Sequence, residues 1–448
     1  MRTRSKLGAL IAIAAASFVA PAYAANSGED FQKDNIPPGA QVINNALEGP
    51  VFTTAEGRTL YRWPKKSLRN GNTGEIQGKP ACDDTVYRVN SGLMSPYPGG
   101  FILPDADTRV SCVAMYPPFL APADAKPMGK WSIVDRADGR KQWAYDDWPL
   151  YTYALDKLPG EAMGGSNLDN STETGAGRIP IGPDANIPSQ FEVSTTMRGR
   201  LVTLKEGWSV YTYEKDGRNK SNCKDDCLDG WQPVLAAAYA RPVGDWTLFE
   251  RSPGVKQWAF RGAPLYRYLT DRKQHGMDGS DNPGWHNVYT QMSPTPPKEF
   301  APKDTMIGVV LGDANGKTIY RYRCTDDAVD QQLCDFPEAP QAYRLAVCGG
   351  GDVDHCLKAF PYVLVARGAK SGNTTWTTLY IDPRTGKRAA EGDAGALHVW
   401  AYRGRPVYTF AGDKRPADIL AHDWGEFNGL RNGYMAIVFR DVFARRDE

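Results

Sequence analysis

The sequence lacks the signatures of the common metal, cofactor and hydrolase sites. It has no His-Glu-x-x-His and no Cys-x-x-Cys spacing, so neither a zinc hydrolase nor a thiolate zinc site is expected. It also lacks the motifs of covalent c-type haem, of α/β-hydrolases and of phosphate-binding loops. We therefore predict no cofactor and assign no catalytic residue.

The sequence also lacks an excess of charge of either sign. The 53 lysines and arginines balance 52 acids to a net charge of +1. No long basic run indicates a nucleic-acid partner or an anionic membrane surface. The one apolar stretch, Leu7 to Ala20, is too short for a stable bilayer anchor, so no transmembrane anchor is expected.

That apolar stretch belongs instead to an export signal. Basic residues at positions 2, 4 and 6 precede it, and Ala22-Tyr23-Ala24 supplies the small residues that a signal peptidase needs. The pattern predicts a signal peptide over 1–24, cleaved near Ala24. The mature protein would be periplasmic or secreted. Eight cysteines, an even number, fit disulfides in that compartment.

One sequence frame occurs three times in the chain. It reads Trp-Ala-aromatic, three residues, then Pro-aliphatic-Tyr-x-aromatic, and it stands within Gln142–Gly160, Gln257–Asp271 and Val399–Asp413. An upstream half with its own tyrosines, at 57–63, 207–213 and 316–322, precedes each copy. The chain is thus predicted to hold three divergent repeat units of roughly 100 residues each.

The repeated strings have β character. A tyrosine and an aromatic residue two positions later point to the same face of a strand, and turn dipeptides such as Asp138-Gly139 and Asn315-Gly316 recur. β-Branched and aromatic residues dominate. We predict an all-β protein of short antiparallel strands, arranged as a sandwich, barrel or propeller-like array. Only Leu228 to Ala240 suggests a short helix.

Composition suggests the boundaries of the units. The polar residues after the signal peptide predict a flexible arm, the Gly- and Asn-rich stretch 160–188 a long loop, and the run Ser293 to Pro297 a linker. The resulting prediction is an arm at 25–48, unit 1 at 49–190, unit 2 at 191–292, a linker at 293–304 and unit 3 at 305–448.

The repeat also suggests which cysteines pair. Cys223 and Cys227 lie four residues apart in unit 2, and Cys82 is the only partner for Cys112 in unit 1. Unit 3 allows three pairings. We favour Cys324–Cys334 together with Cys348–Cys356, because the Cys348–Cys356 loop then corresponds to the Cys223–Cys227 loop of unit 2.

At these tyrosines the chain resembles a known family, the secreted repeat of unknown function, found in predicted bacterial lipoproteins and secreted proteins. Its Tyr-x-aromatic-x-x-Asp motif is degraded at Tyr61, where Lys66 replaces the acid, and shifted at Tyr320. No lipid-attachment cysteine is present. The resemblance implies export and a fold class but no activity. The complete motifs are Tyr151, Tyr153 and Asp156; Tyr211, Tyr213 and Asp216; Tyr266, Tyr268 and Asp271; and Tyr408, Phe410 and Asp413.

The four motif acids are interpreted as structural, accepting backbone N–H groups where the chain turns. Acid-base or metal chemistry at these acids is the alternative. Two polar loops, Asp278 to Asn282 and Asn167 to Asn170, make calcium a candidate ligand, although neither has the twelve-residue pattern.

Three hypotheses for function follow. The first is a non-enzymatic binding or interaction module for a protein, small-molecule or glycan partner, because aromatic-rich repeats lack a unique reactive cluster. The second is an accessory to a periplasmic redox or metal-handling system. The third is a carboxylate-dependent hydrolase, for which the 324–356 region of unit 3 would be the place to search.

Overall fold

The structure is a computed structural model of the chain. It describes residues 28–33, 35–63, 66–68, 71–84, 90–91, 101–102, 111–164, 179–323, 344–345, 348–349, 352–370, 373–426 and 432–441. The predicted signal peptide, the candidate calcium loop at 167–170 and the Cys324–Cys334 pair lie outside these residues.

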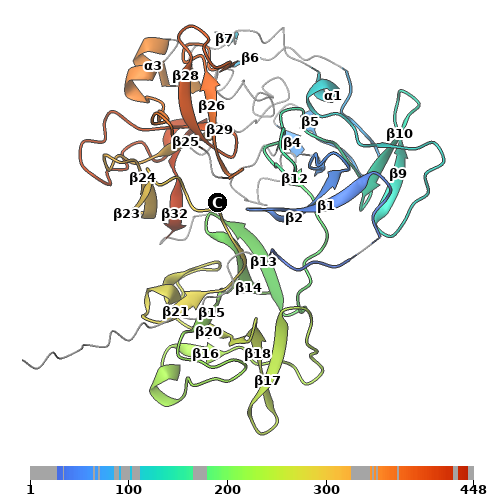
Figure 1. Cartoon of the computed structure of the whole chain (residues 1–448), viewed down its shortest axis with the longest axis vertical. Helices are drawn as coiled ribbons and strands as arrows, with labels where there is room; N and C mark the ends of the chain where they lie inside the picture. Colours follow the sequence, from blue (N-terminus) through green and yellow to red (C-terminus); the bar gives the residue numbers. More distant parts are fainter. Residues whose placement is uncertain are drawn as a thin grey trace, which may run out of the picture.

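The regular structure of the described chain consists mainly of short antiparallel strands, with few helical residues, which confirms the all-β prediction. Figure 1 shows three lobes around a common centre, coloured blue to cyan, green to yellow, and orange to red. The lobes follow the order of the three repeat units along the sequence.

Unit 1 begins with a hairpin and continues through small sheets. The hairpin pairs Ala40 with Thr54 and Asn45 with Gly49. The elements of the unit are β1 (Ala40–Asn45), β2 (Gly49–Thr54), β3 (Tyr61–Arg62), β4 (Lys66–Leu68), β5 (Gly71–Thr73), β6 (Asn90–Ser91), β7 (Phe101–Ile102), α1 (Cys112–Met115), β8 (Leu120–Ala121), β9 (Trp131–Asp135), β10 (Lys141–Tyr145), β11 (Trp148–Pro149) and β12 (Ile179–Pro180).

Unit 2 has three sheets, in the strand orders β13-β14-β22, β16-β20-β15-β21 and β17-β18-β19. Its elements are β13 (Phe191–Thr196), β14 (Gly199–Leu204), β15 (Val210–Tyr213), the 3₁₀ turn η3 (Asp225–Leu228), β16 (Trp231–Pro233), β17 (Trp246–Ser252), β18 (Val255–Phe260), β19 (Ala263–Pro264), β20 (Tyr266–Tyr268), the 3₁₀ turn η4 (Asp278–Asp281), β21 (Trp285–Asn287) and β22 (Tyr289–Met292).

Unit 3 joins the corresponding strands into one three-stranded and one seven-stranded sheet, β23-β24-β32 and β27-β26-β28-β29-β25-β31-β30. Its elements are β23 (Ala301–Thr305), β24 (Gly308–Gly312), β25 (Tyr320–Arg323), α3 (Val353–Ala359), β26 (Trp376–Ile381), β27 (Arg388–Ala389), β28 (Leu397–Tyr402), β29 (Arg405–Tyr408), β30 (Trp424–Glu426), β31 (Asn432–Ala436) and β32 (Val438–Asp441).

Units 2 and 3 agree in detail as well as in outline. In both, the third strand of the first sheet pairs with a register shift just after the hairpin turn, after Arg200 in one and Val309 in the other. A glycine stands at this turn in each, Gly199 with φ +136° and Gly308 with φ +118°. A Cβ on Gly199 would lie 2.3 Å from the Gln291 carbonyl oxygen, so no other residue fits there.

A pair of tryptophans forms the centre of each core. The two come from neighbouring strands, such as β17 and β18, and each is at most 2% exposed. A phenylalanine contacts the first tryptophan of each pair, with ring centroids 4.4 to 5.2 Å apart. Aromatic groups of this size supply the apolar burial that such short strands need. The pairs are Trp131 and Trp143, Trp246 and Trp258, and Trp376 and Trp400.

Several expected boundaries differ in the structure. The arm predicted at 25–48 contains β1, and the linker predicted at 293–304 contains the start of β23 at Ala301. Each of these two strands pairs along its length with a largely buried strand that follows it, β1 with β2 and β23 with β24. The short helix suggested after Leu228 is wrong, because β16 begins at Trp231.

Candidate functional site

The motif tyrosines of the two halves of each unit lie opposite each other in an antiparallel ladder. Tyr211 of β15 pairs with Tyr266 of β20. Each of the other two units has the same pairing, so the halves are related by an approximate two-fold axis. The equivalent pairs are Tyr320 with Tyr408 and Tyr61 with Tyr151.

The first tyrosine of each pair donates its hydroxyl to the acid that ends the motif of the second half. Tyr211 donates to both carboxylate oxygens of Asp271, at 2.7 and 2.9 Å. All of these side chains are buried except for a small exposed fraction. The equivalent bonds join Tyr61 to Asp156 at 2.6 Å and Tyr320 to Asp413 at 2.7 Å.

In units 1 and 2 the second tyrosine donates in the opposite direction, to an acid of the first half. Tyr266 hydrogen bonds to Asp216 at 2.7 Å. In unit 1 the motif acid is missing, and Tyr151 donates to Glu75 instead, which is fully buried. Glu75 thus accepts the hydrogen bond that the motif acid would accept if position 66 were an aspartate instead of Lys66.

The motif acids also accept backbone N–H groups. Asp156 accepts from Met163 at 3.0 Å, Asp413 from Leu420 at 3.1 Å, and Asp216 from Asn222 at 2.7 Å. Each acid therefore fastens the turn that follows its strand to the tyrosine of the other half. This geometry is what a structural carboxylate requires.

Burial shifts the acids toward the protonated form. It raises the pKa of Asp156 to about 7 and that of Asp271 to about 6, against the opposing effect of the tyrosine hydrogen bonds. The pKa values of Asp216 and Asp413 are raised for the same reason. Burial and the adjacent carboxyl also raise the pKa of Tyr61 far above its usual range.

The second aromatic residue of each motif joins a stack of rings beside the tyrosine pair. In unit 2, Tyr213 stacks on Trp285, and Trp285 stacks on Trp231 at 3.5 Å between centroids. Tyr268 closes the stack against Trp231 at 4.6 Å. Unit 3 repeats it with Phe410, Phe360 and Tyr434, and in unit 1 Tyr153 packs on Tyr116.

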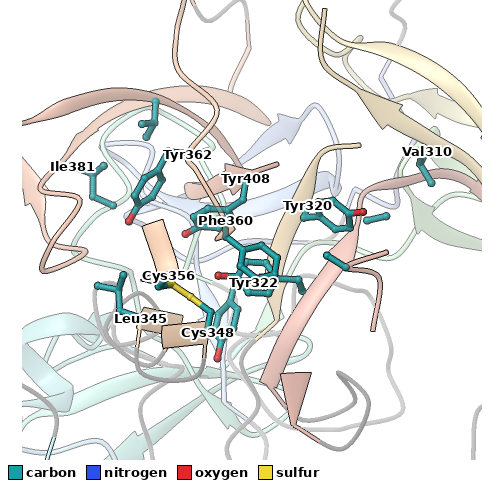
Figure 2. Close-up of a cluster of buried hydrophobic side chains, with 14 residues drawn as sticks. Val310, Tyr320, Tyr322, Leu345, Cys348, Cys356, Phe360, Tyr362, Ile381 and Tyr408 are labelled. Carbon is teal, nitrogen blue, oxygen red and sulfur yellow. A yellow bond between two sulfur atoms is a disulfide. The ribbon is translucent and has the colours of Figure 1, made fainter. Parts of the chain in front are cut away.

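The cysteines lie next to these stacks. The structure joins Cys82 to Cys112, Cys223 to Cys227 and Cys348 to Cys356, with Cα atoms 5.1 to 5.4 Å apart. Figure 2 shows the third of these among Leu345, Tyr322 and Phe360. Each bridge stays within its unit, as a modular repeat requires.

Units 1 and 2 share a buried polar chain that ends at these bridges. Arg251 donates to the Gln257 side chain at 3.0 Å and to the Cys223 carbonyl at 2.6 Å. Gln257 in turn donates to the Leu265 carbonyl at 2.8 Å. In unit 1, Arg136, Gln142, Cys82 and Leu150 form the same chain.

Unit 3 differs from the other two at this point. Apolar Ile381 and Val399 occupy the strands that carry the Arg–Gln pair elsewhere, and both are buried. A cation, fully buried Arg344, instead stacks over Tyr408 at 4.3 Å and donates to the Tyr362 and Tyr434 hydroxyls. Within the 324–356 region, unit 3 thus carries a buried arginine, whereas its Ile381–Val399 pair replaces the Arg–Gln pair of the other units.

The described residues provide no set of ligands for the calcium or other metal ion considered above. Among the described residues, no group of three or more His, Cys, Asp or Glu side chains is placed to hold a metal ion. In the candidate calcium loop, Asp278 forms an ion pair with Arg272 at 2.6 Å. Within the same part of the chain, no helix combines the length and apolar character needed to cross a bilayer.

Sequence reasoning missed the residues that join the units. Arg200 of β14 forms an ion pair with buried Glu29 at 2.9 Å, and Arg403 forms one with Glu48 at the tip of the first hairpin. Met197 packs against the tryptophan core of unit 3. These contacts link residues far apart in sequence, and no repeated motif marks them.

Repetition also identifies one surface position. A leucine that pairs with a buried residue of β10, β18 or β28 is itself exposed in every unit. The three are Leu120, Leu235 and Leu364, which pair with Gln142, Gln257 and Val399 and are 39%, 48% and 59% exposed. Packing within the unit gives no reason for an apolar residue at this position.

Comparison with known proteins identifies the repeats. No curated protein and no solved structure matches the chain. The model of one family matches 132–168, 192–235 and 247–288. Each matched segment contains one complete tyrosine motif, so the family's repeat corresponds to half of a unit, and unit 3 lies outside the matches. The chain thus carries three copies of the repeat described as the secreted repeat of unknown function.

Proposed function

We propose that this is an exported, non-catalytic repeat protein that binds a partner through the outer surfaces of its units. The observation that carries the proposal is the reciprocal tyrosine–acid network. It binds every motif acid inside a unit, with both directions present in units 1 and 2 and the Tyr320–Asp413 bond repeating one direction in unit 3. Catalysis needs one distinctive site, whereas a repeated, internally satisfied network supports an architectural role.

The exposed leucines support a binding role. Leu120, Leu235 and Leu364 are each more than a third exposed, yet all three divergent units carry a leucine at this position. An exposed apolar side chain that recurs at the same position of three divergent units suits contact with a protein partner. The proposed contact surface is therefore the edge of each unit that this leucine occupies.

Export is part of the proposal. The predicted signal peptide, cleaved near Ala24, would deliver the chain to the periplasm or beyond. N-terminal sequencing of the protein recovered from the periplasmic and extracellular fractions tests this directly. A mature chain starting at Ala25 supports it, whereas an intact Met1 in the cytoplasmic fraction contradicts it.

A photo-crosslinking experiment in the producing cell tests binding. The wild type is compared with a variant carrying Leu→Glu at 120, 235 and 364, with the crosslinker placed at exposed Lys256, beside Leu235. A matched control carries Leu→Glu at Leu158 and Leu420, which are 54% and 62% exposed. We expect specific adducts in the wild type and the control, and their loss in the triple variant. Equal adducts in all three, with unchanged melting temperatures, would refute the leucine surface.

A second function, an accessory role in redox or metal handling, rests on the stacked rings beside the disulfides. Metal analysis and an absorption spectrum of the purified protein distinguish it from the first proposal. Bound metal or a visible chromophore would favour the accessory role.

A further inference from the structure

The first described residues of the chain run as an extended strap over the link between units 1 and 2. We use "the strap" for residues 28–33. Phe31 forms a β-bridge with Ala185, and the Gln32 N–H donates to the Asp184 carbonyl at 2.9 Å. The Asn186 N–H donates back to the Asp30 carbonyl at 3.0 Å. The strap is therefore held by backbone pairing to the linking segment.

One strap side chain enters unit 2. Glu29 is 5% exposed, whereas its neighbours Gly28 and Asp30 are exposed. Arg200 donates two hydrogen bonds to its carboxylate, at 2.9 and 3.0 Å, and the Thr290 hydroxyl donates a third at 2.5 Å. The Glu29 N–H donates to the Gln291 side chain at 3.4 Å. This alternation is typical of an extended segment that presents one side chain to a prepared site.

The site continues into the contact between all three units. Arg200 also donates to the Thr195 hydroxyl at 2.8 Å, and that hydroxyl donates to Glu48 at 3.4 Å. Glu48 in turn forms an ion pair with Arg403 of unit 3. The Glu29 carboxylate thus neutralises the first cation of a chain of polar contacts that reaches Arg403 of unit 3.

We propose that unit 2 and the 184–186 segment form a binding site for an extended, glutamate-bearing peptide, with polar contacts from Arg200, Thr290 and Gln291. The occupant of this site is the strap of the same chain. Its binding locks unit 1 against unit 2. Pro37, Pro38 and Gly39 separate the strap from β1. The strap can therefore leave without unravelling the first hairpin, whereas an empty site leaves the Arg200 guanidinium without its carboxylate partner.

The full-length chain provides the first test. Hydrogen exchange is compared for the wild type and for Glu29→Gln, Arg200→Gln and the exposed control Glu206→Gln. We expect the Gln32 and Asn186 amides to exchange at least about tenfold faster in the first two variants and unchanged in the control. The amides of the β17–β18 hairpin should keep their protection in all variants. Unchanged exchange at Gln32 and Asn186 would overturn the proposal.

The second test supplies the strap in trans. A labelled peptide of residues 28–36 is titrated into the full-length Glu29→Gln chain, whose own strap is weakened. We expect it to bind at least about tenfold more tightly than the same peptide carrying Glu29→Gln, because a charge-assisted pair is lost. A peptide carrying Lys33→Gln should bind like the unaltered one. Equal affinity of all three peptides, or no binding by any of them, would show that the site does not recognise this segment.

Discussion

Tyr211 and Tyr266 face each other across the β15–β20 ladder, and each donates its hydroxyl to the acid that lies five residues after the other. The arrangement crosses over, because neither tyrosine uses the acid of its own motif. The tyrosine of each half thus donates the hydrogen bond that the acid in the other half's turn accepts.

Removal of one hydroxyl tests how much this crossing contributes. Tyr211→Phe leaves the buried Asp271 carboxyl without its main donor, so we expect the free energy of unfolding to fall by about 1 to 3 kcal/mol. Denaturant titration measures the change, and Tyr239→Phe, at a residue 86% exposed, should have no effect. A Tyr211→Phe variant as stable as the Tyr239→Phe control would contradict the structural role.

Stability should also depend on pH through the buried acids. The pKa of Asp156 is raised to about 7 in the folded chain, so the folded state binds this proton more tightly than the unfolded state does. This contribution to stability is complete below the unfolded pKa of about 4 and is lost as the pH rises to about 7. Each tenfold difference in proton affinity between the folded and unfolded states corresponds to about 1.4 kcal/mol of stability. The melting temperature should fall over this range.

Asp156→Asn mimics the protonated side chain and should remove that part of the pH dependence. Melting curves from pH 4 to 8 for this variant, the wild type and the exposed control Asp124→Asn make the comparison. If the wild type and Asp156→Asn show the same slope, Asp156 does not titrate as its burial predicts.

Unit 3 suggests a repair for unit 2. Gln257→Val alone removes the side-chain acceptor that Arg251 has on β18, and we expect a loss of about 1 to 3 kcal/mol. Adding Arg251→Ile recreates the apolar pair of Ile381 and Val399 and should recover part of that loss. Strictly additive losses in the double variant would show that the two positions are not coupled.

The disulfides should differ in their contributions. The Cys82–Cys112 bridge spans 30 residues and the Cys223–Cys227 bridge spans four. The loss of chain entropy in the unfolded state predicts about 3.6 kcal/mol for the longer loop and about 2 kcal/mol for the shorter. Paired Cys→Ala variants, compared by denaturant titration, should follow this order. Peptide mapping without reduction should in addition recover Cys324 linked to Cys334.

The sequence predicted the strands well because the signal is local. A tyrosine and an aromatic residue at alternate positions define a strand face, and the Trp-Ala-aromatic frame places the core tryptophan beside it. The three-fold repetition strengthened the prediction, since a frame that recurs with the same spacing cannot reflect chance composition.

The crossed pairing could not be predicted in the same way. A local motif suggests a local contact, and Asp216 stands closest in sequence to Tyr211, yet its partner is Tyr266. Glu75 could have been found by asking which acid comes first in the sequence after Lys66. Contacts such as Glu29 to Arg200 depend on how whole units pack, for which the repeat carries no signal.

Because the hydroxyl of each half-unit reaches its acceptor only in the partner half, a single family repeat has one donor and one carboxylate that it cannot satisfy alone. A chain cut between β16 and β17 should therefore yield two fragments that fold only when mixed. Growth or shrinkage of such arrays during evolution would then proceed by whole pairs of repeats, since an odd copy would add an unsatisfied acid to the interior.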